Sequence, residues 1–296
     1  MRLTSLLCTA LLASCATTAP GNSDQLAIAT GTVAANLEHP LYAASDHDAT
    51  CKVFHHVWAP DGRLLTKGLG GLFPHHHGLF LGWNKMRCRG HSFDFWHCQR
   101  GETQRFVAFV APESCGLAAD WQVAAIDWLA GDGQPVLHER RALRARVARD
   151  DSTVLDVQIQ LRAASDPVQL TGDPQHAGHQ FRALQQFAEK GAEPVRYVRP
   201  TTAKPQPNDV WANCAWIAAV LPLTDGPVTV LRIEGEHNPR PVLWSTRGYG
   251  RFGATFSHEL LPRQPLELRY TYIVALGERD ADWCERTATQ TAASAD

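Results

Sequence analysis

The chain has 296 residues, of which 44% are hydrophobic and 20% are charged. Such a length and composition are typical of a folded protein with a sizeable core and exclude a disordered chain. The formal net charge of −2 excludes the strongly basic surface by which proteins bind nucleic acid, so we expect no nucleic-acid partner. No apolar run reaches the roughly 18 residues that a membrane-spanning helix needs.

The N-terminus has the pattern of an export signal. Met1-Arg2 precedes an apolar run that is too short to span a bilayer. The run ends in Leu-Ala-Ser-Cys at positions 12–15, which resembles the lipobox of bacterial lipoproteins, where the cysteine carries the lipid. We therefore expect a lipoprotein signal peptide over residues 1–14, lipidation of Cys15 and a lipidated tether over 15–35. An ordinary signal peptide cleaved at another small residue is the alternative.

This interpretation makes the protein an exported one. Ala16 follows the cysteine where some lipoproteins carry aspartate, which by analogy favours the outer membrane. We expect an outer-membrane lipoprotein that faces the periplasm or the cell surface and touches the membrane only through its lipid anchor. In an oxidising compartment the six remaining cysteines can form disulfides or stay as buried thiols, and their irregular spacing fixes no pairing.

Alternation of apolar and polar residues dominates the chain after the tether. Residues 154–161 and 266–276 place apolar side chains on one face and mostly polar ones on the other, which indicates strands. Further strands are expected at 51–58, 78–83, 92–98, 105–111, 121–128, 136–147, 211–221, 228–233 and 251–256. Turn sequences such as Pro60-Asp61-Gly62 separate them.

A single helix is expected at the end of the chain, over residues 280–291, with Asp280 as its N-cap. Many antiparallel strands with little helix predict an all-β fold, an antiparallel β-sandwich with a short C-terminal helix. The mutarotase-like supersandwich is one form that such a fold takes. No internal repeat or change of composition divides residues 36–296, so we expect them to form one β-sandwich domain.

Three consecutive histidines stand in a glycine-rich segment over residues 68–85. An extended backbone would place His75 and His77 on one face and His76 on the other. Two neutral imidazoles on one face suit a divalent metal or an acid/base pair near neutral pH. A polar loop whose histidines bond to backbone carbonyls is the alternative. Trp83, Asn84 and Lys85 follow and are expected to bind substrate.

A second cluster consists of Asp94, Trp96, His97 and Glu102. In a strand, Asp94 and Trp96 would face one way and His97 the other. A carboxylate, a large aromatic ring and an imidazole are what a sugar site uses for hydrogen bonding, stacking and proton transfer. A core tryptophan beside a hydrogen-bonded aspartate is the alternative.

A third cluster lies over residues 172–182, where Gly-Asp-Pro indicates a turn and a strand follows. His176 and His179 can reach a common point from such a loop, and Arg182 can hold an anionic group. By contrast, the Gly-x-Gly-x-x-Gly match at 248–253 precedes a strand-like run and no helix, so a dinucleotide site is rejected there.

Together these segments resemble the PmoA-like family of uncharacterised exported proteins. The resemblance covers roughly residues 50–275 and rests on the motifs at 60–62, 65–68, 70–85, 94–97 and 172–182. It implies a β-rich fold and export by polysaccharide-degrading bacteria, and it brings no established reaction. His77 stands where many relatives carry arginine, which favours His75 and His76 as ligands.

We therefore expect an envelope-anchored, carbohydrate-active enzyme, a hydrolase or lyase acting on a glycoside. His76, Asp94, His97 and Glu102 would be catalytic, and His75, His77 and His176 would bind a divalent metal if the protein holds one. Trp83, Asn84, Lys85, Trp96, His179 and Arg182 would bind the substrate. The alternatives are a non-catalytic glycan-binding lipoprotein and a structural metal-bound lipoprotein. Each leading hypothesis requires the three clusters to meet in one pocket.

Overall fold

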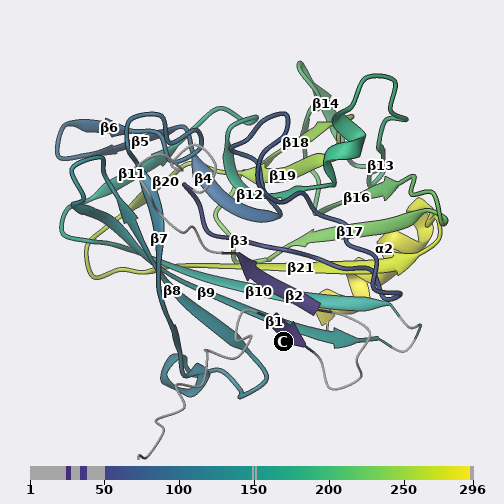
Figure 1. The fold of residues 1–296 in the computed structure, drawn as a ribbon, viewed down its shortest axis with the longest axis horizontal. Helices are drawn as coiled ribbons and strands as arrows, with labels where there is room; N and C mark the ends of the chain where they lie inside the picture. The colour runs from purple at the N-terminus through teal and green to yellow at the C-terminus, as the bar shows by residue number, and fades with distance from the viewer. Residues whose placement is uncertain (1–24, 28–33, 39–50, 149, 151, 294–296) are drawn as a thin grey trace, which may run out of the picture.

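The computed structural model describes residues 25–27, 34–38, 51–148, 150 and 152–293. Its strands pair antiparallel in three sheets, and one short helix ends the described chain (Figure 1). The prediction of an all-β, antiparallel sandwich with a short C-terminal helix is therefore confirmed. The residues of the expected signal peptide, 1–14, and Cys15 lie outside the described residues. Part of the expected tether is a strand, because residues 25–27 pair with residues 34–36.

The largest sheet has nine strands. In spatial order they are β1 (Gln25–Ala27), β2 (Ala34–Glu38), β3 (Phe54–His55), β4 (Leu79–Trp83), β12 (Ala177–Arg182), β19 (Arg251–Thr255), β18 (Leu243–Arg247), β15 (Val210–Ala212) and β14 (Lys204–Gln206). β4, β12 and β19 form its middle and carry the surface on which the candidate site is built.

The second sheet has eight strands and the third has four. The second runs β13 (Arg196–Val198), β16 (Trp216–Leu221), β17 (Val228–Glu234), β21 (Leu266–Leu276), β10 (Thr153–Ala163), β9 (Pro135–Val147), β8 (Gln122–Leu129) and β7 (Thr103–Val110). The third runs β20 (His258–Leu260), β11 (Val168–Thr171), β5 (Lys85–Cys88) and β6 (His91–Phe93).

The core lies between the two large sheets. Phe181 of β12 packs against Tyr272 of β21 with ring centroids 6.3 Å apart, and Trp83 of β4 packs against Trp128 of β8 at 6.2 Å. Because side chains alternate along a strand, residues next to these core positions point to the opposite face. Phe80 does so, since it packs with Phe54 and Trp96 in a separate apolar cluster.

On that outer face of β4, β12 and β19, the described residues include the loop after β6 and the turn before β4. A glycine in β4 allows the backbone of a loop to approach this face closely. A Cβ at Gly82 would lie 2.5 Å from the Phe95 carbonyl oxygen, so the loop after β6 packs directly on the backbone of β4. The site described below is formed between this face and its covering loops.

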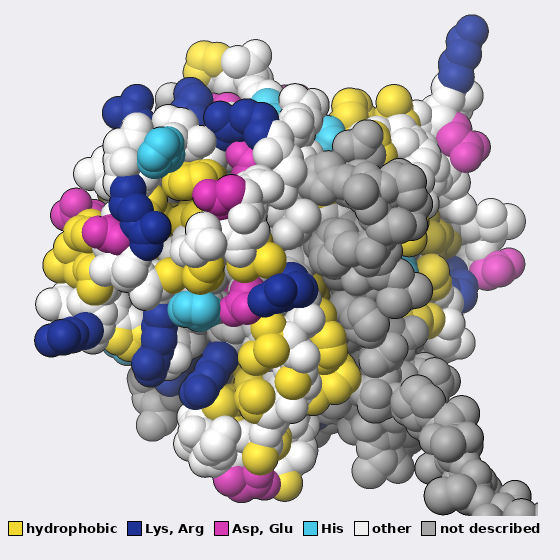
Figure 2. Space-filling model, turned by 60° about the vertical axis from the view of Figure 1, so that its left-hand side comes forward, with side chains coloured by type: hydrophobic (Ala, Val, Ile, Leu, Met, Phe, Trp, Pro, Cys, Tyr) yellow, Lys and Arg dark blue, Asp and Glu magenta, His cyan; other side chains and the backbone are white. Residues whose placement is uncertain are grey.

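The C-terminal helix α2 (Ala281–Ala293) begins where the sequence predicts, and the Asp280 carboxylate accepts a hydrogen bond from the Trp283 N–H at 2.8 Å. No helix in the described ranges is long and apolar enough to cross a membrane. No disulfide joins the six cysteines that the structure describes. On the face in Figure 2, acidic side chains lie among basic ones, consistent with the small net charge.

Candidate functional site

The histidine-rich segment before β4 is a turn and not an extended strand. The His76 N–H donates to the Phe73 carbonyl at 3.0 Å, and Phe73 has a positive φ of 56°. The rings of His75 and His76 are therefore neighbours, 4.3 Å apart, whereas His77 stacks on Phe54 at 4.8 Å. The expectation that His75 and His77 share a face is wrong, because side chains do not alternate through a turn.

The three histidines differ in their access to solvent. His75 is half-buried, whereas His76 and His77 are buried. Burial, followed by the charge of Lys52, lowers the pKa of His75 to about 3. Burial also holds the pKa values of His76 and His77 well below their ordinary value. All three imidazoles are therefore neutral at pH 7, where they are weak bases.

The Asp94–His97 segment is a turn closed by its own aspartate. The Cys98 N–H donates to the Asp94 carbonyl at 2.9 Å. One Asp94 carboxylate oxygen accepts the Trp96 and His97 N–H groups at 3.0 and 2.9 Å, and the other lies 2.8 Å from His97 Nδ1. The expected strand over 92–98 ends at Phe93, because Asp94 hydrogen-bonds its own backbone and turns the chain.

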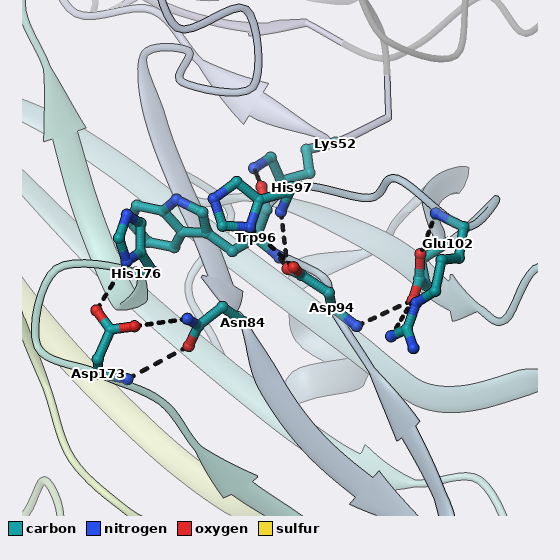
Figure 3. Close-up of polar contacts among 9 residues, drawn as sticks. Lys52, Asn84, Asp94, Trp96, His97, Glu102, Asp173 and His176 are labelled. Atoms are coloured by element: carbon teal, nitrogen blue, oxygen red, sulfur yellow. Dashed lines mark hydrogen bonds and ion pairs between the residues drawn. The ribbon is translucent and has the colours of Figure 1, made fainter.

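The Asp173–His176 segment repeats this arrangement. His176 Nδ1 lies 2.7 Å from one Asp173 carboxylate oxygen, which also accepts the Gln175 N–H at 3.0 Å. The Asn84 side-chain amide donates to the other oxygen at 2.6 Å. Figure 3 shows the two histidines on either side of Trp96, each beside its own aspartate.

Residues from all three sequence clusters meet here. The rings of His97 and His176 lie 5.2 Å apart, and the ring of His75 lies 4.8 Å from that of His97. The side chains of His97 and His176 are 25% and 36% exposed, so solvent and small molecules reach them. The structure thus places three imidazoles and two carboxylates, Asp94 and Asp173, at one partly open point.

The charges of the two pairs follow from their hydrogen bonds. Burial acts to raise the pKa of Asp94, but the bonds from the His97 ring and backbone outweigh it and hold the pKa below its ordinary value. Asp173 behaves in the same way through the bonds from Asn84 and His176. Burial lowers the pKa of His176 in spite of Asp173. At pH 7 the His176–Asp173 pair is a neutral imidazole beside a carboxylate.

Two residues expected to bind substrate lie on the wrong face of the sheet for that role. Trp83 is fully buried in the core between the sheets. His179 is also fully buried there, stacked on Tyr270 at 4.6 Å and 3.0 Å from the Tyr272 hydroxyl. Strand alternation in β4 and β12 directs both side chains away from the site.

Other expected residues lie beside the site but cannot take the roles given to them. Trp96 is fully buried, so its ring is closed to stacking with a sugar. Glu102 is 2% exposed and accepts the Asp94 N–H at 3.0 Å and the Arg100 guanidinium at 2.8 Å, so it braces the Asp94 turn. Arg182 is buried beneath the site and bonds to backbone carbonyls.

Two surface grooves flank the paired histidines. One, of about 510 Å³, is lined by Asp173 and His176 together with the β14–β15 turn. The other, of about 540 Å³, is lined by Asn84, Lys85 and Asp94 together with β5, β6 and β11. Since Asn84 is hydrogen-bonded to Asp173, this contact stands between the grooves.

Sequence reasoning missed the aromatic rim of the site. Tyr249 lies in the turn between β18 and β19, and its ring is 4.9 Å from that of Phe73. Both residues are half-buried, and the Phe73 ring lies 6.5 Å from that of His75. The glycine-rich match rejected as a dinucleotide site is therefore the hairpin that carries Tyr249. An aromatic residue between glycines at a hairpin tip was the available signal.

Sequence reasoning also missed Lys52, which precedes β3. Its ammonium donates to the Trp96 carbonyl and lies 4.9 Å from the Phe80 ring centroid. Nothing in its sequence neighbourhood marks it, because its role depends on contacts more than forty positions away. In the ranges that the structure describes, no three His, Cys, Asp or Glu side chains are arranged to hold a metal ion. The metal prediction for His75, His77 and His176 therefore awaits elemental analysis.

Comparisons with known proteins place the chain in a family. No curated protein matches the sequence significantly. A solved structure named "Putative kojibiose phosphorylase from human microbiome" is similar at a TM-score of 0.37 and 7% identity, over 82% of this chain and 26% of that one. The chain thus spans about a quarter of that protein's length. The model of a family of unknown function, DUF6807, matches residues 30–289, and the chain belongs to this family.

Proposed function

We propose that the protein is a carbohydrate-active enzyme that cleaves a glycosidic bond by acid–base catalysis, with His97 and His176 as the catalytic residues. The observation that carries the proposal is the pair of His–Asp contacts, at 2.8 and 2.7 Å, whose imidazoles lie 5.2 Å apart and partly open to solvent. Two proton-transferring groups on opposite sides of a bond are what glycoside cleavage requires.

The hydrogen bonds assign a role to each ring nitrogen. In each pair Nδ1–H donates to the aspartate, so the other nitrogen, Nε2, is left to face the ligand. Because its lowered pKa leaves His176 unprotonated at pH 7, we assign His176 as the base. It takes a proton from water in hydrolysis, or from a carbon in elimination, while His97 in its protonated form gives a proton to the departing oxygen. Asp94 and Asp173 orient the rings and stabilise the imidazolium.

The surroundings favour a saccharide as the ligand. Phe73 and Tyr249 supply an aromatic surface beside His75, and sugars stack on such rings. The flanking grooves are lined by amides, carboxylates and a lysine, which suit hydroxyl groups. Expected substrate-binding residues Asn84 and Lys85 lie in one groove and keep that proposed role.

The test is a screen of oligosaccharides in water enriched in heavy oxygen, with the products weighed by mass spectrometry. Hydrolysis adds one labelled oxygen to a product, whereas elimination adds none and leaves an unsaturated sugar. His97→Ala and His176→Ala should abolish turnover. His138→Ala is the matched control, because His138 forms a similar pair with Asp127 at 2.7 Å on β8 and β9. Saccharide binding without turnover by the wild type would instead support the non-catalytic glycan-binding alternative.

We also propose that the enzyme is exported and lipid-anchored through Cys15, which lies outside the described residues. Incorporation of labelled palmitate into the wild-type protein but not into Cys15→Ala, with loss of the variant from the membrane fraction, is the expected result. Equal labelling of both proteins would overturn the anchor and leave the catalytic proposal unaffected.

A further inference from the structure

Four cationic side chains are buried beneath the site. Lys52, Lys67, Arg182 and Arg251 are each at most 3% exposed. Among the described residues, none of the four forms an ion pair with a carboxylate. A buried charge without a counter-ion is costly, by several kcal/mol in general.

Neutral groups hold these cations. Lys52 donates to the Trp96 carbonyl and lies 5.5 Å from the Trp96 ring centroid. Arg251 donates to the Gln180 side-chain oxygen at 2.8 Å and to the Ser245 hydroxyl at 2.9 Å, and lies 5.8 Å from the same tryptophan ring. Lys52 and Arg251 therefore both lie beside Trp96, whose ring is 5.8 Å from that of His176.

The other two cations lie under the aromatic rim. Arg182 donates to the Tyr249 carbonyl at 2.5 Å and lies 4.7 Å from the Tyr249 ring. Lys67 donates to the His76 carbonyl at 3.0 Å. Each cation thus contacts either a ring that borders the site or the backbone of the histidine turn. The positive charge is placed directly behind the surface that a ligand would touch.

The same fold pairs its other buried arginines. Arg141 lies 2.6 Å from Glu139, and Arg232 lies 3.0 Å from Glu234, in both cases between the two large sheets. Among the described residues, the buried cations without a carboxylate partner therefore all lie on the face that carries the site. In the part of the chain that the structure describes, the carboxylates at the histidine pairs are Asp94 and Asp173, with Glu102 behind Asp94 already paired with Arg100.

Buried hydrogen-bond donors without a partner also lie near the site. The Trp96 indole N–H and both ring nitrogens of His76 are buried and have no hydrogen-bond partner among the described residues. Both rings lie next to the open imidazoles, since His76 is 4.3 Å from His75 and Trp96 is 5.8 Å from His176. An acceptor bound at His97 and His176 would lie next to these unpaired donors and in a positive field.

We propose that the saccharide bound here carries a carboxylate, as uronic acids do, and that the buried cations select it through their field. The proposal rests on the proposed function and adds its substrate class. The four cations stay buried and act through Trp96, Tyr249 and His76, which makes them specificity-determining and not catalytic residues. A carboxylate at the site supplies a counter-charge that the described residues do not provide.

The test compares matched ligands. Calorimetry measures the affinity of the wild-type protein for a panel of glucuronate- and galacturonate-containing oligosaccharides, and for the same oligosaccharides with every carboxylate reduced to a hydroxymethyl group. We expect at least one acidic member to bind about tenfold or more tightly than its reduced counterpart. Lys52→Met and Arg251→Met should each lower this ratio, whereas Arg162→Gln, which removes an exposed charge from β10, should not.

The outcomes separate the substrate class from the function. Equal affinity for acidic and reduced members of each pair would overturn the substrate class and leave a saccharide site in place. Binding to neither form of any pair would overturn both proposals. Should the buried variants fail to fold, the wild-type ratio alone decides, because it requires no substitution.

Discussion

Lowering the pH should destabilise the fold well before its carboxylates titrate. Four histidines, His55, His76, His77 and His179, are buried, and burial holds each pKa well below the ordinary value of 6.5. Below pH 6.5 these side chains take up protons in the unfolded chain and not in the folded one. The unfolded state then binds more protons, so stability falls as the pH falls.

The size of the effect follows from the number of groups. Between pH 6.5 and 5.5 each such histidine lowers the free energy of unfolding by about 1 kcal/mol, so the four together lower it by about 4 kcal/mol. Aspartates with lowered pKa values, such as Asp94 and Asp173, lose their stabilising charge only below about pH 4 and do not contribute in this window. Domains are stable by roughly 5–15 kcal/mol in total, so the loss should be large.

Urea denaturation at pH 7.5, 6.5 and 5.5 measures this free energy. His77→Phe should keep the ring contact with Phe54 and lessen the loss of stability between pH 6.5 and 5.5 by about 1 kcal/mol, because one buried neutral histidine is gone. Thr201→Ala, an exposed substitution that changes no titratable group, is the control and should leave the slope unchanged. Equal stability at pH 6.5 and 5.5 would refute the assignment of these histidines as buried and neutral.

Three further predictions concern the site. Trp96→Ala should lower the free energy of unfolding by about 3–5 kcal/mol, because the ring is fully buried, and a loss below 1 kcal/mol in urea denaturation would contradict this. Tyr249→Ala should weaken saccharide binding in calorimetry by about 0.5–1.5 kcal/mol through the lost ring surface, and unchanged affinity would exclude the tyrosine from the rim. Asp173→Asn should lower kcat about a hundredfold with little change in KM, since it disturbs the orientation of His176, and an unchanged kcat would remove Asp173 from the mechanism.

The long strands could be predicted from the sequence because the alternation of apolar and polar residues is enough to identify them. Residues 154–161 and 266–276 lie in β10 and β21 and pair along their length, with Leu155 opposite Tyr272. The expected strand 211–221 is instead two strands, β15 and β16, which belong to different sheets. Asn213 has a positive φ of 57° between them, and nothing in its sequence context requires that conformation.

The candidate site could be found in part, because histidines and aspartates grouped in turn sequences mark it. His97 and His176 were selected correctly as neighbours by residue type, whereas Trp83 and His179 were assigned to the site although they face the core. Which face a strand residue takes depends on register, and a single residue decides it. Of the buried cations, the sequence marked Arg182, whereas Lys52, Lys67 and Arg251 were missed because their contacts join segments that are distant in the chain.

The central claim is that His176 transfers a proton during cleavage, with Asp173 as its partner. The most direct test is the turnover number of purified wild-type protein, His176→Ala and His138→Ala on one cleaved oligosaccharide at saturation. We expect the turnover number of His176→Ala to be lower by at least about a hundredfold and that of His138→Ala to equal the wild-type value. Equal turnover of His176→Ala and the wild type would contradict it.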